Sequence, residues 1–512
     1  MDFHSILFRT AEDALPLESE SAPDFFRDLN LDQIIHAVTA DWQEYKLASF
    51  FYVPLHDLDA IAYRQEVVRD LERTEIMQAI RVFSKQMRAM RERIAQAEKM
   101  EHYPHAERRC FLGAAQIYCE AVVSLAACLE ALSPTSRGFC LFRTYLSEYA
   151  ASSYFGTLST NASTLTADLA AIRYSILLRE GSVTVHADAT GTDFSVAVEE
   201  TFEKFRSAAQ SNHWAEPRKW SGMNHIEAQI QNRLALLAPD TFSKLEHFRT
   251  QHTDYLDKAI ARFDREVQFY IAYFDHIDKM RRRGLAFCEP KVSQSSKEIH
   301  GTSVFDLALA GKLLESKASL VTNDFFLKGH ERIFVVSGPN QGGKTTFART
   351  MGQLHYLAAL GLSVPGTDVQ LFLFDRLFTH FEREEDIRNL RGKLQDDLVR
   401  IRHILDEASS DSLVIINEIF ASTTLQDAVY LGRKIMARIS ALDTLAVCVT
   451  FLDELASFDE KTVSLVSTVD SANPALRTFK LERKPADGLA YALAIAQKYR
   501  VTYDQLKERI QS

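Results

Sequence analysis

Residues 338–346 have the sequence Gly338-Pro339-Asn340-Gln341-Gly342-Gly343-Lys344-Thr345-Thr346, and the first eight fit the pattern GxxxxGK[ST]. The apolar run IFVVS precedes them and the helical pattern FARTMGQLHYLAAL follows, which is the strand–loop–helix context that this pattern requires. Glycines let backbone amides turn toward phosphate oxygens, and the helix N-terminus adds its positive dipole end. We expect Lys344 to reach the β- and γ-phosphates and the Thr345 hydroxyl to bind Mg²⁺. The stretch therefore predicts a nucleotide-binding site.

A second candidate site lies where the apolar run 413–416 ends in Asn417 and Glu418. Phosphate-loop proteins use a carboxylate at this strand end to orient Mg²⁺, and ABC-like hydrolases follow it with a glutamate that activates water. Here Asn417 takes the metal-side position with an amide in place of the carboxylate. Glu418 is the candidate catalytic base; the alternative is that it only caps the following segment.

The periodicity of the chain changes near Arg332. After it, short β-rich runs alternate with helical patterns, which is typical of an α/β domain. These runs are 333–337, 413–417, 445–450, 464–469 and 477–482. Before it, apolar residues at three- and four-residue spacing predict helices over 25–150 and 224–283, and two β-prone runs around Glu180 and Gly181 predict a hairpin between them.

Composition limits the class of protein. The chain has 512 residues, of which 46% are hydrophobic and 25% charged, and this excludes a mainly disordered chain. The net charge is 59 − 69 = −10, which argues against a strongly basic nucleic-acid coat but leaves room for a local basic groove. Six cysteines without CxxC spacing favour free thiols in a reducing cytoplasm. The N-terminus lacks a secretory pattern and glutamates interrupt the apolar run 114–132, so we expect no membrane partner.

The phosphate loop GPNQGGKTT closely resembles GPNMGGKST of the MutS DNA mismatch-repair ATPases, with Gln341 in place of methionine. Other segments resemble that family in the same order along the chain, so the likeness does not depend on one motif. They are Pro54–Leu71 (PLxD…RQ…V..L), Val321–Asp324 (VPND), Asp375–Thr379 (DRIFT), Asn417–Thr424 (DEIGRGTS), Asp427 (a later aspartate) and Gly488–Ile510 (the closing helices).

The resemblance implies a multidomain protein with a mainly α-helical core and lever region, a small β-bearing insertion, and an ABC-type α/β P-loop ATPase domain that works as a dimer. The expected segments are an N-terminal extension (1–45), helical core and lever (46–150), an insertion with a clamp-like hairpin (151–223), returning helices (224–325) and the ATPase domain with C-terminal helices (326–512). In the family, a mismatch-reading domain with a Phe-x-Glu wedge precedes the core. About 45 residues precede it here, so we expect no such wedge.

Two departures from the family bear on hydrolysis. Val449-Thr450-Phe451 stands where the family has ATH, so the histidine that would contact the γ-phosphate is replaced by Phe451. Residues 392–396, GKLQD, stand where the family has GRSTF, which contributes to the neighbouring subunit's site. Together with Asn417, these changes predict a slow ATPase, or nucleotide binding used as a conformational switch.

Two functions remain open. The first is a cytoplasmic MutS-like protein that binds ATP and Mg²⁺, dimerises with itself, and clamps structured DNA such as recombination intermediates, with other repair proteins as partners. The alternative is a nucleotide-gated scaffold with little hydrolysis that binds protein or structured RNA, for example on ribosomes. Asn417 and Phe451 favour the scaffold, whereas the order of core, lever and ATPase motifs favours the clamp.

Overall fold

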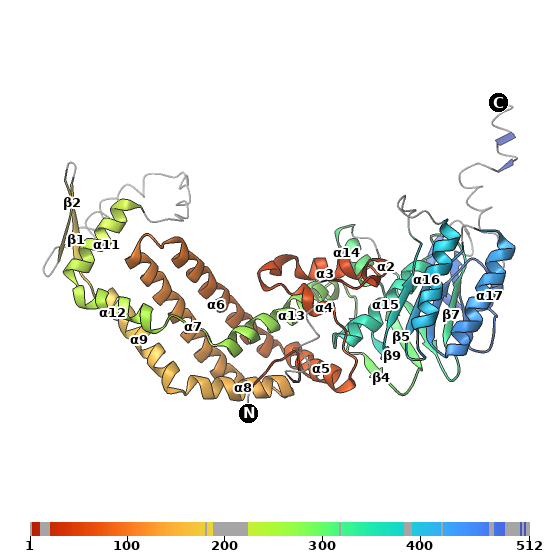
Figure 1. Cartoon of the computed structure of the whole chain (residues 1–512), viewed down its shortest axis with the longest axis horizontal. Coiled ribbons are helices and arrows are strands. Elements are labelled where there is room, and N and C mark those ends of the chain that lie inside the picture. The colour runs from red at the N-terminus through yellow and green to blue at the C-terminus, as the bar shows by residue number, and fades with distance from the viewer. Residues whose placement is uncertain are drawn as a thin grey trace. The chain divides into compact units, whose positions relative to one another are not determined.

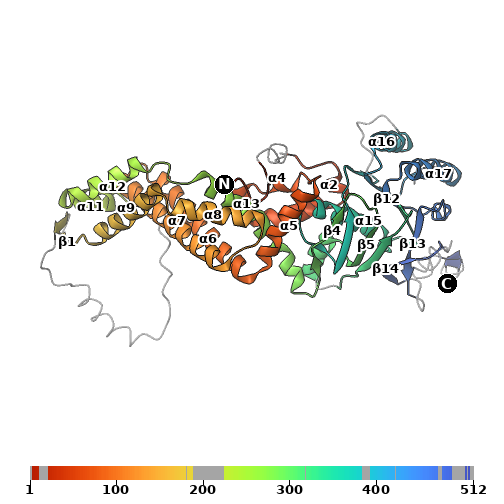
Figure 2. The ribbon, with the colours of Figure 1, turned by 90° about the horizontal axis from the view of Figure 1, so that it is seen from below.

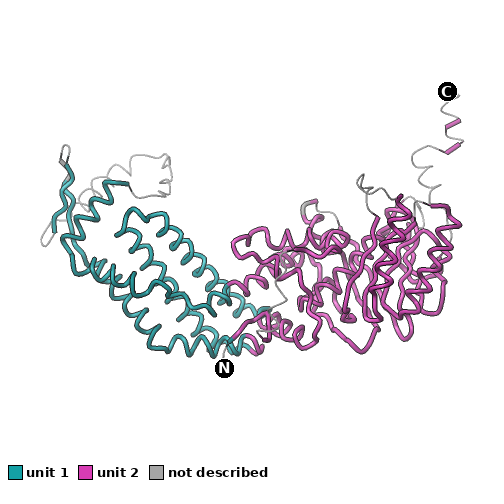
Figure 3. The backbone as a smooth tube through the Cα atoms, viewed as in Figure 1, with its two compact units in different colours: residues 1–3, 71–134, 139–264 teal, residues 4–70, 135–138, 265–512 magenta. Residues whose placement is uncertain are grey.

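The computed structural model describes residues 3–10, 21–179, 182–187, 224–316, 319–382, 392–420, 423–470, 476–486, 502–503 and 506–507. The chain forms two compact units, drawn in different colours in Figure 3. Unit 1 comprises residues 1–3, 71–134 and 139–264, and unit 2 comprises residues 4–70, 135–138 and 265–512. The finer five-segment division expected from the sequence stays a prediction.

Unit 1 is helical, as the apolar spacing predicts. Its elements are α6 (Thr74–Lys99), α7 (Pro104–Leu132), α8 (Arg137–Ala150), α9 (Ser153–Ala170), α11 (His225–Leu237), α12 (Pro239–Gln251) and the first turns of α13 (Lys258–Arg281). Helices α6 and α7 lie side by side in Figures 1 and 2 and are joined by a short turn. Buried apolar residues recur along α6 every three or four positions, from Ile76 through Ile80 and Phe83 to Met87, because that spacing places them on one face.

Helix α7 is long and apolar enough to cross a membrane by length and composition alone. A buried core helix passes the same test, and 56% of the most apolar window of α7 lies buried inside the structure. Its buried positions include Leu112, Tyr118 and Leu125, which contribute to the core of unit 1. These observations fit the core helix expected from the sequence.

The predicted hairpin is present as strands β1 (Tyr174–Arg179) and β2 (Ser182–Ala187), which pair antiparallel. Its turn, Glu180 and Gly181, and the rest of the expected insertion, 188–223, lie outside the described residues. The serine- and threonine-rich stretch before the hairpin forms helix α9. Ser152 caps that helix by accepting a hydrogen bond from the backbone N–H of Phe155, so these polar residues mark a helix start and an exposed helix face.

Unit 2 contains a six-stranded sheet in the order β10-β11-β12-β7-β13-β14. The strands are β7 (Ile333–Ser337), β10 (Leu377–His380), β11 (Leu413–Asn417), β12 (Leu445–Val449), β13 (Thr462–Val469) and β14 (Arg477–Arg483). Neighbours pair in parallel except β13 and β14. The five β-rich runs predicted from the sequence all form strands here; β10 was not predicted, because it is only four residues long.

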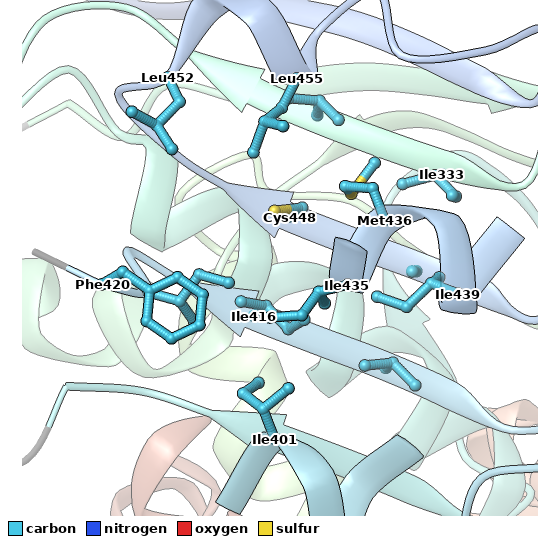
Figure 4. Packing of buried hydrophobic residues seen from close by; sticks show 14 of the residues in the cluster. Ile333, Ile401, Ile416, Phe420, Ile435, Met436, Ile439, Cys448, Leu452 and Leu455 are labelled. Atoms are coloured by element: carbon cyan, nitrogen blue, oxygen red, sulfur yellow. The ribbon is translucent and has the colours of Figure 1, made fainter. Parts of the chain in front are cut away.

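The main sheet is covered on both faces, which explains why its parallel strands are uninterrupted apolar runs. Helices α16 (Lys393–Glu407) and α17 (Leu425–Leu442) cover one face, where Ile401 and Ile439 pack against Ile416 and Cys448 (Figure 4). Helix α15 (Lys344–Ala359) lies on the other face and is buried along almost its whole length. The phosphate loop therefore joins a central strand to a helix that the fold holds rigidly.

Besides most of α13, unit 2 contains several further elements. They are helices α2 (Phe25–Asp28), α3 (Leu31–Thr39), α4 (Ala48–Phe51), α5 (Leu58–Glu72), α14 (Leu307–Ser316), short helices η1 (Ala40–Tyr45) and η2 (Asp453–Leu455), the pair β3 (Phe287–Cys288) and β8 (Val364–Pro365), and the sheet β4-β9-β5-β6. The strands of that second sheet are β4 (Lys291–Ser293), β5 (Ile299–Val304), β6 (Asn323–Leu327) and β9 (Asp368–Phe372). Phe325 of β6 packs against Phe334 and Phe347, which joins the two sheets through the start of α15.

The N-terminal segment is bound directly to the phosphate-loop helix. Gln353 of α15 is fully buried; its amide donates to the carbonyl oxygen of Leu29 at 2.9 Å and to Asp306 Oδ1 at 3.0 Å. A Cβ on Gly352 would lie 2.6 Å from the methyl groups of Leu29, so glycine there allows the two segments to approach closely. The N-terminal extension expected from the sequence is thus part of the support for α15.

Candidate functional site

The phosphate loop (residues 338–345) begins directly after β7 and ends in the first turn of α15. Gly338 and Gly343 have φ angles of +110° and +94°, conformations that side chains with a Cβ rarely adopt. Gln341 also lies in the left-handed region, with φ at +59°. The glycine pattern that predicts the loop therefore corresponds to real backbone requirements at Gly338 and Gly343.

Strand β13 supports the loop from the side. Ser467 is completely buried, and its hydroxyl donates to the carbonyl oxygen of Gly342 at 2.6 Å. A Cβ on Gly342 would lie only 2.2 Å from that hydroxyl oxygen, and one on Gly338 would lie 2.8 Å from the Ser467 carbonyl oxygen. Sequence reasoning missed Ser467, whose only signal was its place on a predicted strand.

Lys344 is buried at the centre of the loop, with 4% of its surface exposed. Its ammonium donates to the carbonyl oxygens of Gly338 at 2.9 Å and Pro339 at 3.2 Å, and to Asn340 Oδ1 at 3.3 Å. Burial lowers the pKa of Lys344, and the Glu418 carboxylate, 3.9 Å away, opposes that shift. The loop thus holds a cation with neutral acceptors, an arrangement that favours binding of an anion.

Thr345 and Asn417 meet at the end of β11, as the sequence predicts. The Thr345 hydroxyl donates to Asn417 Oδ1 at 2.8 Å, and Asn417 is 8% exposed. Mg²⁺ takes oxygen ligands and is usually held by few protein groups plus substrate phosphates, so these two oxygens fit an ion that arrives with a nucleotide. Within the described ranges there is no group of three or more His, Cys, Asp or Glu side chains that could hold a metal without such phosphates.

Glu418 follows Asn417 in an unusual backbone conformation. Glu418 and Phe420 have φ angles of +52° and +62°, and the Glu418 N–H donates to the carbonyl oxygen of Val449 at 2.9 Å. This turn aims a carboxylate that is 31% exposed toward Lys344. Phe420 stands where the family pattern has glycine; its ring is completely buried, and that burial offsets the strained backbone.

Phe451, two residues after β12, is 47% exposed at the same edge of the sheet as Glu418. Its ring has no group that can donate a hydrogen bond to phosphate. Gly392, in the segment that aligns with the family's GRSTF, stands just before α16 as its N-cap residue. The structure thus locates both departures from the family pattern, at a strand end and a helix start.

A cavity of about 320 Å³ adjoins the loop at Gly343 and Thr346. It is lined mainly by apolar side chains, among them Leu309, Leu320 and Phe479. Asn323, in the segment that resembles VPND, ties the cavity to β14: its amide donates to the Phe479 carbonyl oxygen at 3.1 Å and accepts from the Leu481 N–H at 2.8 Å. The size and apolar lining suit a planar base next to the phosphate loop. Sequence reasoning missed Phe479.

Comparisons with known proteins match the part of the chain that carries this site. Residues 334–501 match the family model described as MutS domain V. The DNA mismatch repair protein MutS of Thermosipho melanesiensis is 27% identical over 187 residues, 35% of this chain and 22% of that protein. Endonuclease MutS2 is 31% identical in Gemmatimonas aurantiaca (37% of this chain, 23% of that protein) and 29% identical in Thermus thermophilus (36% and 25%). The match thus spans about a quarter of the length of these relatives. Through residues 334–501, these matches support membership of the MutS family.

Proposed function

We propose that this protein binds ATP with Mg²⁺ at the phosphate loop. The observation that carries the proposal is the buried Lys344 ammonium: among the described residues, neutral oxygens at 2.9–3.3 Å and the more distant Glu418 hold it at the loop. Phosphate oxygens are stronger acceptors than carbonyl oxygens, because the hydrogen bond to them is charge-assisted. A nucleotide whose phosphates enter the loop would exchange these contacts for better ones, while its base occupies the cavity beside Gly343 and Thr346.

Different residues at the loop would carry out the different steps of ATP binding and hydrolysis. Lys344 holds the β- and γ-phosphates, and Thr345 with Asn417 would hold Mg²⁺, which neutralises charge on those phosphates when bound. Glu418 is close enough to Lys344 to lie near the γ-phosphate, and it accepts a proton from the attacking water as general base. Asn417 and Phe451 remove a carboxylate and a hydrogen-bond donor from this scheme, so we propose slow turnover.

We further propose that ATP controls a clamp on DNA. Relatives of this chain are named as a DNA mismatch repair protein and as endonucleases of the MutS2 type. The helical unit 1, which carries the β1–β2 hairpin, suits a clamp arm. In this proposal two copies of the chain act together in the cytoplasm, bind structured DNA such as recombination intermediates, work with other repair proteins, and read no mismatch with a wedge of their own.

The clamp is tested by DNA binding with and without nucleotide. Fluorescence anisotropy with labelled duplex, mismatch and junction DNA, at low salt, is expected to show affinity that ATPγS changes several-fold. Lys344→Ala is expected to abolish the ATPγS effect while leaving nucleotide-free binding intact, because Lys344 lies in the phosphate loop and not on unit 1. Absence of binding to all three DNAs, in both nucleotide states, would refute the clamp.

A second function is a nucleotide-gated scaffold that hydrolyses little ATP and binds protein or structured RNA. The amide of Asn417 and the exposed Phe451 favour it, because both weaken the hydrolytic site while leaving the phosphate loop intact. The two functions differ in which polymer stimulates the ATPase. Rates measured with no polymer, homoduplex DNA, junction DNA and ribosomal RNA are expected to rise with junction DNA for the clamp, and with RNA alone for the scaffold.

A further inference from the structure

A second cation, on the edge strand of the same sheet, contacts the phosphate loop. Arg477 is the first residue of β14, the antiparallel edge strand that pairs with β13. Its Nε–H donates to the backbone carbonyl oxygen of Asn340 at 3.2 Å. The GxxxxGK[ST] pattern contains one cation, its lysine. Arg477 is a second cation at the loop, and it comes from a strand more than 130 residues later in the chain.

Asn340 connects the two cations. Its backbone carbonyl accepts from Arg477, and its side-chain oxygen accepts from the Lys344 ammonium at 3.3 Å. Because the lysine of a phosphate loop contacts the β- and γ-phosphates, Asn340 and Arg477 lie toward that end of a bound nucleotide.

The contacts of both cations in the loop are of a kind that phosphate can replace. Arg477 donates to a neutral carbonyl, and a guanidinium forms stronger, charge-assisted hydrogen bonds with phosphate oxygens, whose geometry its planar fork matches. Phe451 offers no donor at the place where the family pattern has a histidine for the γ-phosphate. The guanidinium of Arg477 on β14 can supply a hydrogen-bond donor to those phosphates.

We propose that Arg477 positions the terminal phosphates and gives the site its preference for a nucleoside triphosphate over a diphosphate. The proposal rests on the nucleotide site proposed above and adds to it the residue that distinguishes the two nucleotides. In this scheme Arg477 leaves the Asn340 carbonyl and donates to the β,γ end of the triphosphate, whereas a diphosphate lacks the γ-phosphate and binds mainly through Lys344.

The test is isothermal titration of the full chain with ATPγS and with ADP, both with Mg²⁺. Arg477→Ala is expected to weaken ATPγS about tenfold and ADP less than about threefold, because charge-assisted bonds to the γ-phosphate are lost. Arg477→Lys, which keeps the charge but not the fork, is expected to fall between the two. Arg483→Ala is the matched control: this arginine lies on the same strand but pairs with Glu331, at 3.2 Å, and should leave both affinities unchanged.

Three results would overturn the proposal. Unchanged ATPγS affinity in Arg477→Ala, with wild-type binding intact, would reject the role of Arg477 and leave the nucleotide site standing. Equal weakening of ATPγS and ADP would show that Arg477 only supports the loop structurally. Failure of the wild-type chain to bind either nucleotide would reject the nucleotide site itself, and the proposal with it.

Discussion

Substituting Gly342 by alanine tests the geometry of the phosphate loop directly. The added Cβ would lie 2.2 Å from Ser467 Oγ and 2.9 Å from the Pro339 carbonyl oxygen, both closer than real Cβ contacts allow. The Ser467 side chain cannot simply turn away, because its hydroxyl is buried and donates to the Gly342 carbonyl. Either the loop shifts or that hydrogen bond breaks.

The expected cost follows from these contacts. Overpacking a rigid site costs about 1–3 kcal/mol, and a buried hydroxyl without its partner costs about 1–3 kcal/mol. Because either outcome costs about 1–3 kcal/mol, we expect Gly342→Ala to lower the free energy of unfolding by about 1–3 kcal/mol. Urea unfolding of the full chain, followed by circular dichroism, measures this. Gly156→Ala is the matched control, because a Cβ there meets nothing within 4 Å and alanine favours the helix in which it lies.

A double-mutant cycle identifies the contact responsible. Ser467→Ala removes the oxygen that Gly342→Ala would strike, so in the double variant part of the cost, about 1 kcal/mol, should be recovered. Stability of Gly342→Ala within about 0.5 kcal/mol of wild type would contradict the loop geometry. An absence of coupling between the two positions would show that Ser467 does not set the position of the loop.

Four further outcomes are expected. Glu418→Gln should slow ATP hydrolysis further without weakening ATP binding, and an unaltered rate would remove Glu418 from the mechanism. Asn417→Asp should raise the Mg²⁺ dependence and rate of hydrolysis about tenfold, measured by phosphate release, since it restores the metal-side carboxylate. Gln353→Ala should lower the free energy of unfolding by about 2–4 kcal/mol, because it breaks buried hydrogen bonds to Leu29 and Asp306. Burial lowers the pKa of His355 to about 4, so the unfolded chain binds an extra proton below pH ~6.5; stability should fall from there toward pH 4, and less steeply in His355→Gln.

The parts of the site that are local in sequence could be predicted. The strand, loop and helix around Lys344 follow one another within about 25 residues. Apolar runs indicate the strand and the helix, and glycines indicate the loop between them. The end of β11 could also be predicted from the sequence. A buried apolar strand that ends at Asn417 places Asn417 and Glu418 where the strands of the sheet end. Thr345 and Asn417 were both assigned to Mg²⁺ from the phosphate-loop pattern, and the Thr345 hydroxyl donates to Asn417 Oδ1.

Contacts between distant segments could not be predicted. The Ser467 hydrogen bond to Gly342 spans 125 residues and depends on β13 lying beside β7, which strand patterns alone do not reveal. Likewise, nothing in the composition of the first 45 residues indicates that Leu29 packs on Gly352 and receives a hydrogen bond from Gln353. Phe420 is the clearest example. A phenylalanine gives no indication of a left-handed backbone, and the buried turn after Glu418 imposes that conformation.

The most direct test of nucleotide binding at the phosphate loop is titration of the full chain with Mg²⁺ and ATPγS in the calorimeter, for wild type and Lys344→Ala. The loop geometry predicts saturable binding by wild type and a loss of about 100-fold or more in the variant, ~2.7 kcal/mol, because Lys344 is the buried cation at its centre. Lys434→Ala, which removes a cation on α17, should bind like wild type. Equal affinity of wild type and Lys344→Ala for ATPγS would contradict the assignment of the site.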